Sequence, residues 1–224
     1  RMLDADFLRI TGNSLVLAGS AALVTLLVGL FMAYGKRLHG DRLVRGAVRV
    51  AGMGYAIPGT VIAIGVMIPF AWLDNTIDTW MRARFDFSTG LLLSGTLAAL
   101  LFAYMVRFLA VALQTVEAGL ARIRPSMDEA ARALGFGPLD VLKKVHVPML
   151  RGSLITAMLL VFVDVLKELP ATLVLRPFNF NTLAVRTYEL AADERLADAA
   201  SGSLAIVLAG IIPVILLSQS LSRT

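Results

Sequence analysis

Three charged residues lie within one apolar stretch of the sequence, residues 153–175. They are Asp164, Lys167 and Glu168. In a continuous helix Asp164 and Glu168, four residues apart, would share one face, and Lys167 could neutralise Asp164. Each charge in the middle of a membrane costs about 2.5–3.5 kcal/mol on insertion scales, so such a group needs partners or water. Two interpretations follow: a set of ion pairs that fixes helix packing, or the lining of a path for a polar substrate.

The second interpretation assigns four residues to a translocation path: Asp164, Lys167, Glu168 and Pro170. Carboxylates suit hard cations better than thiolates do, so these acids could serve a metal cation in transit, a polyamine or another cation. A fourth charge, Arg107, falls in the apolar segment 91–113, and we expect it to snorkel toward the cytoplasmic surface. The chain has no cysteine, and both histidines, His39 and His146, fall in basic loops. Neither a resident metal site nor a cofactor is therefore predicted.

Membrane-spanning helices must position these residues. The chain is 58% hydrophobic and 17% charged, with a mean hydropathy of +0.78. Soluble domains carry about 25% charged residues, so this balance is typical of a membrane protein. A span needs about 20 apolar residues, and five segments qualify: 12–34, 50–72, 91–113, 153–175 and 201–218. Because lipid offers no partners to an open backbone, we predict an all-α polytopic bundle of about five transmembrane helices.

The distribution of charge between these segments predicts their orientation. Segments 35–49 and 114–152 carry an excess of Lys and Arg, whereas 73–90 and 176–200 carry more acids than bases. The positive-inside rule therefore places segment 114–152 and the C-terminus in the cytoplasm, and the N-terminus outside. The same distribution accounts for the net charge of +5. It requires contact with a lipid membrane but no nucleic acid as a partner.

Two short helices around a glycine turn are predicted between the third and fourth spans. The stretch 125–134 is helical by composition, and Ser126 with Glu129 could form a capping box at its start. Glycine suits the end of a helix, so Gly135 is expected to end the first helix. Proline suits the first position of a helix, so Pro138 is expected to open the second. A free linker would be more polar and less regular than this hairpin.

This hairpin has the features of a docking surface for a cytoplasmic partner. Seven residues carry that hypothesis: Glu129, Ala130, Ala131, Gly135, Phe136, Gly137 and Pro148. The alanines permit close approach, the glutamate offers a charge, the phenylalanine is expected to be exposed near the turn, and the last proline is expected to end the second helix. The alternative is a surface hairpin that packs on its own bundle, and the residues alone leave both interpretations open.

The same residues resemble the cytoplasmic EAA loop of binding-protein-dependent ABC transporter permeases. That pattern is E-A-A, three residues, G, nine residues, then I-x-L-P. Here it is matched by Glu129-Ala130-Ala131, Gly135 and then Val145-His146-Val147-Pro148, with valine at both aliphatic positions. The resemblance implies that the hairpin is the coupling helix, which sits in a groove of a separate ATPase subunit. It assigns the charged contact to Glu129 and the turn to Gly135.

A narrower resemblance involves "KELPATLVLRP" at 167–177 and "GYAIPGTVIAIG" at 54–65. Both stretches are similar to the permeases for ferric iron. This resemblance implies a multi-pass permease subunit of the bacterial inner membrane that transports ferric iron. Its expected partners are a periplasmic substrate-binding protein and a cytoplasmic ATPase, as a dimer. Residues 1–224 are expected to form one permease domain, the C-terminal half of a longer permease, paired with a second half or a homologous subunit.

Other functions compete with this one. The chain lacks the G-x-x-x-x-G-K-[ST] pattern that cradles nucleotide phosphates, and it has no nucleophile–base arrangement, so a transporter subunit is expected rather than an enzyme. Within the same transporter class, the substrate could be a polyamine, thiamine or another small solute. A secondary transporter driven by an ion gradient would show inverted repeats, and no clear repeat is present. A non-transporting scaffold would use the hairpin only to bind a partner.

Overall fold

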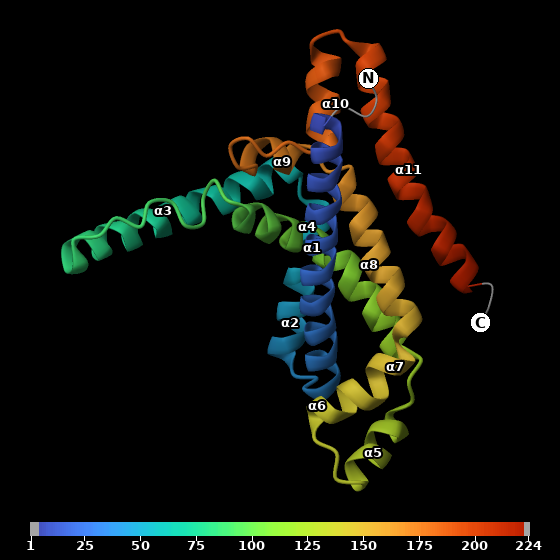
Figure 1. Cartoon of the computed structure of the whole chain (residues 1–224). Helices are drawn as coiled ribbons and strands as arrows, with labels where there is room; N and C mark the ends of the chain where they lie inside the picture. Colours follow the sequence, from blue (N-terminus) through green and yellow to red (C-terminus); the bar gives the residue numbers. More distant parts are fainter. Residues whose placement is uncertain (1–4, 222–224) are drawn as a thin grey trace.

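A computed structural model describes the backbone of residues 5–221, and the side chains of this range except those of 213 and 216–221. Helices occupy most of this part of the chain (Figure 1). Their bounds are α1 Ala5–Leu38, α2 Arg42–Ala51, the 3₁₀ turn η1 Gly54–Ala56, α3 Gly59–Phe85, α4 Leu97–Ala121, α5 Pro125–Ala133, α6 Pro138–Val141, the π-helical turn η2 Leu142–His146, α7 Val147–Met149, α8 Arg151–Leu166, α9 Pro170–Leu175, α10 Leu183–Ala192 and α11 Leu196–Leu221.

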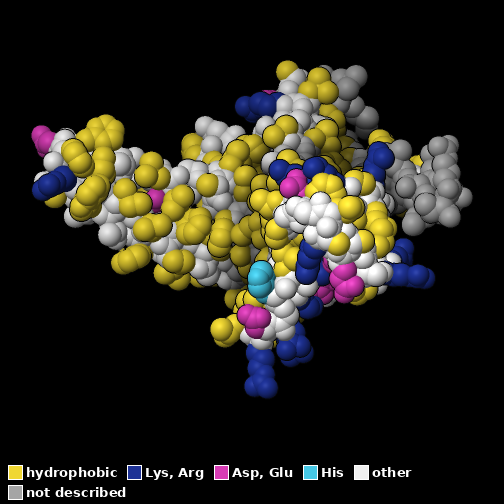
Figure 2. Space-filling view, turned by 90° about the horizontal axis from the view of Figure 1, so that it is seen from below, with side chains coloured by type: hydrophobic (Ala, Val, Ile, Leu, Met, Phe, Trp, Pro, Cys, Tyr) yellow, Lys and Arg dark blue, Asp and Glu magenta, His cyan; other side chains and the backbone are white. Residues whose placement is uncertain are grey.

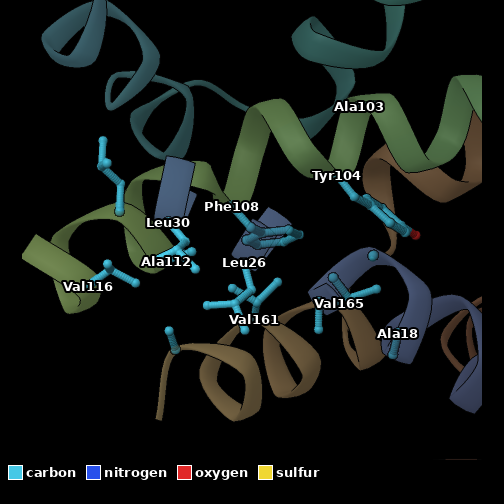
Figure 3. Close-up of a cluster of buried hydrophobic side chains, with 14 of the residues drawn as sticks. Ala18, Leu26, Leu30, Ala103, Tyr104, Phe108, Ala112, Val116, Val161 and Val165 are labelled. Carbon is cyan, nitrogen blue, oxygen red and sulfur yellow. The ribbon is translucent and has the colours of Figure 1, made fainter. Parts of the chain in front are cut away.

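Helices α1, α4 and α8 form the centre of the molecule and pack on one another. Their contact faces combine small residues, such as Ala18, Ala103 and Ala112, with larger apolar ones, such as Phe108 and Val161 (Figure 3). Small residues allow helix backbones to approach closely inside a membrane, where the hydrophobic effect does not drive helices together. At Gly29 of α1, an added Cβ would lie 3.3 Å from the Ala112 side chain of α4. The core is thus held by close van der Waals contact.

Three helices are individually long and apolar enough to cross a membrane: α1, α3 and α4. The segments 138–149 and 151–166 would together make a fourth span, although they are bent by 79° relative to each other. The fifth expected span falls in α11, which contains the apolar helical stretch Leu196–Ile212. An all-α membrane architecture, as the composition predicts, is therefore confirmed.

The second and fourth spans begin and end elsewhere than the hydropathy pattern suggests. The apolar segment 50–72 is interrupted, because Pro58 precedes the first turn of α3 and that helix continues to Phe85. The apolar segment 153–175 is interrupted after Leu166, and Pro170 opens α9 as a separate helix. Before Pro58, Ile57 is extended, as proline favours in the residue that precedes it. Pro170 has no N–H to donate to the carbonyl four residues earlier, that of Leu166, where α8 ends. Mean hydropathy does not register this backbone effect.

Helix α3 extends away from the bundle as an arm (Figure 1). Its base, with Ile62 and Val66, packs on α4 and α9. Beyond the base, the return segment 86–96 is fastened to the helix by two carboxylates. Asp74 accepts hydrogen bonds from the backbone N–H groups of residues 92–94 at 2.7–3.2 Å. Asp78 accepts from the N–H groups of residues 89 and 90. These acids serve the arm itself, which explains why a helix with an apolar exterior carries them.

Candidate functional site: a helical hairpin and a membrane ion-pair group

The helical hairpin comprises α5, α6, η2 and α7, residues 125–149, at one end of the bundle (Figure 1). Its glycine turn is confirmed. Gly135 has a φ of +83°, and its N–H donates to the Arg132 carbonyl at 2.9 Å. Only glycine adopts this left-handed conformation without a steric penalty, so α5 ends here. Pro138 then opens α6, as expected.

Two details of the hairpin differ from the sequence prediction. The predicted capping box is wrong, because α5 begins at Pro125 with Arg124 as the N-cap, which makes no side-chain capping bond. Proline already favours the first helical position, so a Ser126 cap one residue later is displaced. Pro148 does not end the second helix either: it lies within α7, and the chain bends at Leu150. Leu150 is buried and holds that bend against the bundle.

The outer surface of the hairpin carries part of the predicted docking surface. Glu129, Ala130 and Pro148 are exposed. Ala131 is buried, and Phe136 is half-buried with the Lys144 ammonium 4.8 Å from its ring centroid, so the expected exposure of Phe136 is wrong. A cation over an aromatic face is attracted by the electron-rich ring, which draws Phe136 back onto the hairpin. Gly137 precedes α6 in extended conformation and makes no close contact.

Two leucines that the sequence analysis did not single out are the most exposed apolar residues here. Leu134 and Leu139 flank the turn and are 77% and 61% exposed. Seen from this end, charged side chains gather over the molecule, whereas the arm is mostly hydrophobic (Figure 2). The surface around Glu129 therefore combines charge with two apolar side chains. The position of these two leucines on either side of the glycine turn was the signal available in the sequence.

The inner side of the hairpin is fastened to the bundle by a buried polar cluster. His146 was expected in a basic loop, but it is fully buried, and its Nε2 lies 2.7 Å from Asp128 Oδ1. Arg37, in the last turn of α1, donates from Nε to Asp128 Oδ2 at 2.8 Å. Burial alone would raise the pKa of the Asp128 carboxyl, but the hydrogen bonds from Arg37 and His146 outweigh it and lower that pKa. Asp128 therefore stays ionised throughout the physiological range.

Tyr34 completes this cluster one turn earlier on α1. Its hydroxyl donates to the Pro138 carbonyl at 2.7 Å, and its ring packs edge-on against the His146 ring, with centroids 5.2 Å apart. The opening residue of α6 is thus tied to the same helix end as Asp128. The sequence offered little sign of this cluster, because its members lie as far as 112 residues apart from one another, between 34 and 146.

The charged residues of the predicted path are brought together in two pairs. Asp164 and Lys167 form the expected ion pair, with 2.9 Å between the carboxylate and the ammonium. Glu168 does not share a helical face with Asp164, because α8 ends at Leu166. It instead lies 3.2 Å from Nε of Arg107 on α4. The backbone N–H of Ala171 also donates to the Glu168 carboxylate, at 3.2 Å.

Arg107 of α4 is the partner of Glu168, a pairing that the sequence did not predict. It was expected to snorkel to the surface, yet it lies midway along α4, and Nη1 donates to the Ile57 carbonyl at 2.7 Å. Buried charge is tolerated when it is paired and hydrogen-bonded, which removes the reason to snorkel. Gly59 makes room for the pair: a Cβ there would lie 2.5 Å from Glu168 Oε1 and 3.3 Å from Arg107 Nη1. The Pro58-Gly59 step therefore has a packing role.

The two ion pairs differ in how far their side chains are exposed. Glu168 is 7% exposed, and its charge is used within the protein. Lys167, by contrast, has a side chain that is 64% exposed, and Pro170 is exposed at the start of α9. Within residues 5–221, no group of three or more His, Cys, Asp and Glu side chains is arranged to hold a metal ion. The arrangement thus consists of neutralised pairs with one cation directed outward.

Solved structures with the same architecture come from ABC transporters. The chain matches a bacterial ABC transporter involved in the import of alginate with a TM-score of 0.76 and 12% identity, over 98% of this chain and 80% of that one. It matches an inward-facing methionine ABC transporter with a TM-score of 0.69 and 16% identity, over 96% of this chain and 94% of that one. At these identities the likeness establishes the fold alone, a polytopic α-helical membrane architecture.

Residues 25–223 match the family described as binding-protein-dependent transport system inner membrane component, and the chain belongs to that family. It is 26% identical over 215 residues to an Fe(3+)-transport system permease protein of Haemophilus influenzae, covering 96% of this chain but only 39% of that relative. It is 29% identical over 210 residues to a putative 2-aminoethylphosphonate transport system permease protein of Salmonella typhimurium, covering 94% of this chain and 72% of that relative. The family places the chain in the inner membrane as a multi-pass protein.

Proposed function

We propose that this chain is a permease subunit of an ABC importer that is driven through the helical hairpin by a separate cytoplasmic ATPase. One observation carries the proposal: a family member presents Glu129 and Ala130 on the outer face of a structured hairpin whose inner face is fixed to the bundle. A conformational change in a partner can alter the permease only through a contact of this kind. Exposed Leu134 and Leu139 add apolar area to that contact.

The proposed function implies an orientation of the chain in the membrane and further partners. The hairpin end faces the cytoplasm, where an ATPase dimer binds, and the α10–α11 turn faces the periplasm, where a substrate-binding protein delivers its cargo. The excess of basic residues in 114–152 supports this orientation. A second permease half or a homologous subunit completes the path. The apolar exterior of the α3 arm, with Trp72 and Trp80 exposed, supports contact with that subunit or with lipid.

For the substrate, the resemblance of 167–177 to ferric iron permeases and the Haemophilus influenzae relative support ferric iron. The Salmonella relative supports a second candidate, 2-aminoethylphosphonate. The Lys167 ammonium is paired with Asp164, but its side chain is 64% exposed, so it suits a phosphonate or an anionic ferric chelate. The two carboxylates are paired and largely buried, so they offer little accessible negative charge to a bare cation. The path residues in this proposal are Asp164, Lys167, Glu168 and Pro170, with Lys167 contacting the substrate.

Reconstitution tests the function. The full-length protein is purified with the ATPase and binding protein encoded beside it, placed in proteoliposomes, and supplied with ATP and either radioactive ferric iron or 2-aminoethylphosphonate. ATP-dependent uptake that requires the binding protein is expected. Uptake that follows an imposed ion gradient without ATP would contradict the proposal and favour a secondary transporter.

The orientation is tested by labelling. Because residues 1–224 contain no cysteine, single cysteines at Lys143 and Asp193 can be labelled without background from this part of the protein. Both side chains are exposed, and they lie at opposite ends of the molecule. A membrane-impermeant maleimide added to intact spheroplasts should label Asp193→Cys and leave Lys143→Cys unlabelled until the membrane is opened. The reverse pattern would overturn both the orientation and the ATPase contact.

A further inference from the structure

We propose that four side chains form a rigid joint through which movement of the hairpin reaches α1 and α4. The joint consists of Tyr34, Arg37, Asp128 and His146. It rests on the proposed function, because the hairpin must receive force from an ATPase for a joint to transmit it. The role concerns positioning, since none of the four residues faces the proposed path.

Arg37 gives the joint its connectivity. Besides Nε to Asp128, its Nη1 donates to the Leu120 carbonyl at 2.6 Å and its Nη2 donates to the Ile123 carbonyl at 2.9 Å. The Leu120 carbonyl lies in the last turn of α4 and the Ile123 carbonyl just beyond the helix, where carbonyls lack the i+4 partner of a continuing helix. One planar guanidinium thus binds the end of α1, the end of α4 and the first turn of α5. A flexible ammonium could not reach three acceptors in this fixed geometry.

Asp128 connects the joint to the docking surface. It immediately precedes Glu129, and the two differ in environment: Asp128 is buried and bonded to Arg37 of α1, whereas Glu129 is exposed. Both Asp128 oxygens are occupied, one by Arg37 and one by His146 of η2. The hairpin is consequently held at both of its halves, through α5 and through η2. Displacement of its outer face must displace Arg37 or break these bonds.

His146 provides a second observation that points to a function for the cluster. It is fully buried, and its Nδ1 has no hydrogen-bond partner among the described residues. An unpaired buried nitrogen is destabilising, and each such group calls for an explanation. The π-helical turn η2 contains this histidine, and π-turns inside helices occur frequently at functional sites. Holding Asp128 in place is the role that its Nε2 contact supports.

The joint leads directly to the membrane ion pair. Leu120, which accepts from Arg37, and Arg107, which pairs with Glu168, are on the same helix α4. Thirteen residues of α-helix span about 20 Å, so one continuous helix links the joint to the pair. Because α1, α4 and α8 are closely packed, a shift of the α4 end cannot be absorbed locally. Movement of the hairpin would therefore reach the Arg107–Glu168 pair.

The test compares uptake with ATP hydrolysis in the same proteoliposomes, using the substrate that the wild type accumulates. Asp128→Asn removes the charge with little change in shape, and Arg37→Lys keeps the charge but loses the triple contact. Asp140→Asn is the matched control, because it removes the same charge from the same hairpin at an exposed pair with Lys144. A protein with only a structural defect would lose assembled complex, and uptake and ATP hydrolysis would fall together.

We expect Asp128→Asn and Arg37→Lys to bind the ATPase and hydrolyse ATP, while uptake per ATP falls about fivefold or more, within the usual range of coupling between sites. Asp140→Asn should keep the wild-type ratio. If Asp128→Asn does not assemble, Arg37→Lys decides alone. An unchanged ratio in Arg37→Lys, or loss of assembly in both variants, overturns the joint. A wild type without ATP-dependent uptake overturns the proposed function itself, so the two failures are distinguishable.

Discussion

Neutralising one member of the Arg107–Glu168 pair is predicted to destabilise the protein, whereas neutralising both is not. Glu168→Gln would leave the Arg107 guanidinium, with a side chain 20% exposed, beside a neutral amide. Removing one partner of a buried ion pair typically costs about 3–5 kcal/mol, because the other charge stays desolvated. For a domain of this length, 1 kcal/mol shifts the melting temperature by about 2–4 °C, so we expect a loss of about 6–20 °C.

Melting in detergent, followed by the fluorescence of the two tryptophans, measures this loss. The double variant Arg107→Gln/Glu168→Gln contains no unpaired charge and should recover most of the melting temperature. Asp198→Asn is a matched control, because both members of its pair with Arg195 are more than half exposed and surface pairs contribute only about 0–1 kcal/mol. If Glu168→Gln melted with the wild type, or if the double variant were less stable than either single variant, the pair would not stabilise the fold as reasoned.

Three further predictions follow from named contacts. Gly59→Ala should destabilise the protein by about 1–3 kcal/mol, since its Cβ would lie 2.5 Å from Glu168 Oε1. Gly65→Ala is the control and should not destabilise it, because nothing lies within 4 Å of a Cβ there. Equal melting temperatures for the two variants would contradict the packing role of Gly59. Leu134→Ser should leave the melting temperature unchanged but weaken co-purification with the ATPase, because this leucine is 77% exposed; full retention of the ATPase would remove it from the contact. Folding lowers the pKa of the Asp128 carboxyl, so the ionised carboxylate stabilises the protein fully above the unfolded pKa of about 3.9, and this stabilisation is lost as pH falls through the lower folded pKa. The difference in urea stability between wild type and Asp128→Asn should therefore be constant from about pH 5 to 8 and shrink below about pH 4. A difference that changed near neutral pH would refute this prediction.

The sequence alone determined the features that depend on composition or on near neighbours along the chain. Hydropathy predicted an all-α membrane protein, and this is confirmed. The residue types at 135 and 138 predicted the turn of the hairpin, because the left-handed conformation of Gly135 is a local backbone property. The Asp164–Lys167 pair was equally predictable, since three residues of helix bring two side chains together regardless of the rest of the fold.

Only the tertiary structure decided which distant residues meet. Glu168 was expected beside Asp164, but the break before Pro170 turns it toward Arg107, which is 61 residues earlier in the chain. His146 was expected in a loop, but it is buried beside Asp128 and joined through it to Arg37. Helical periodicity relates residues a few positions apart, whereas the partner of a buried charge depends on how separate helices pack. The cost of an unpaired charge explains why partners had to exist, and the packing of α1, α4 and α8 determines which they are.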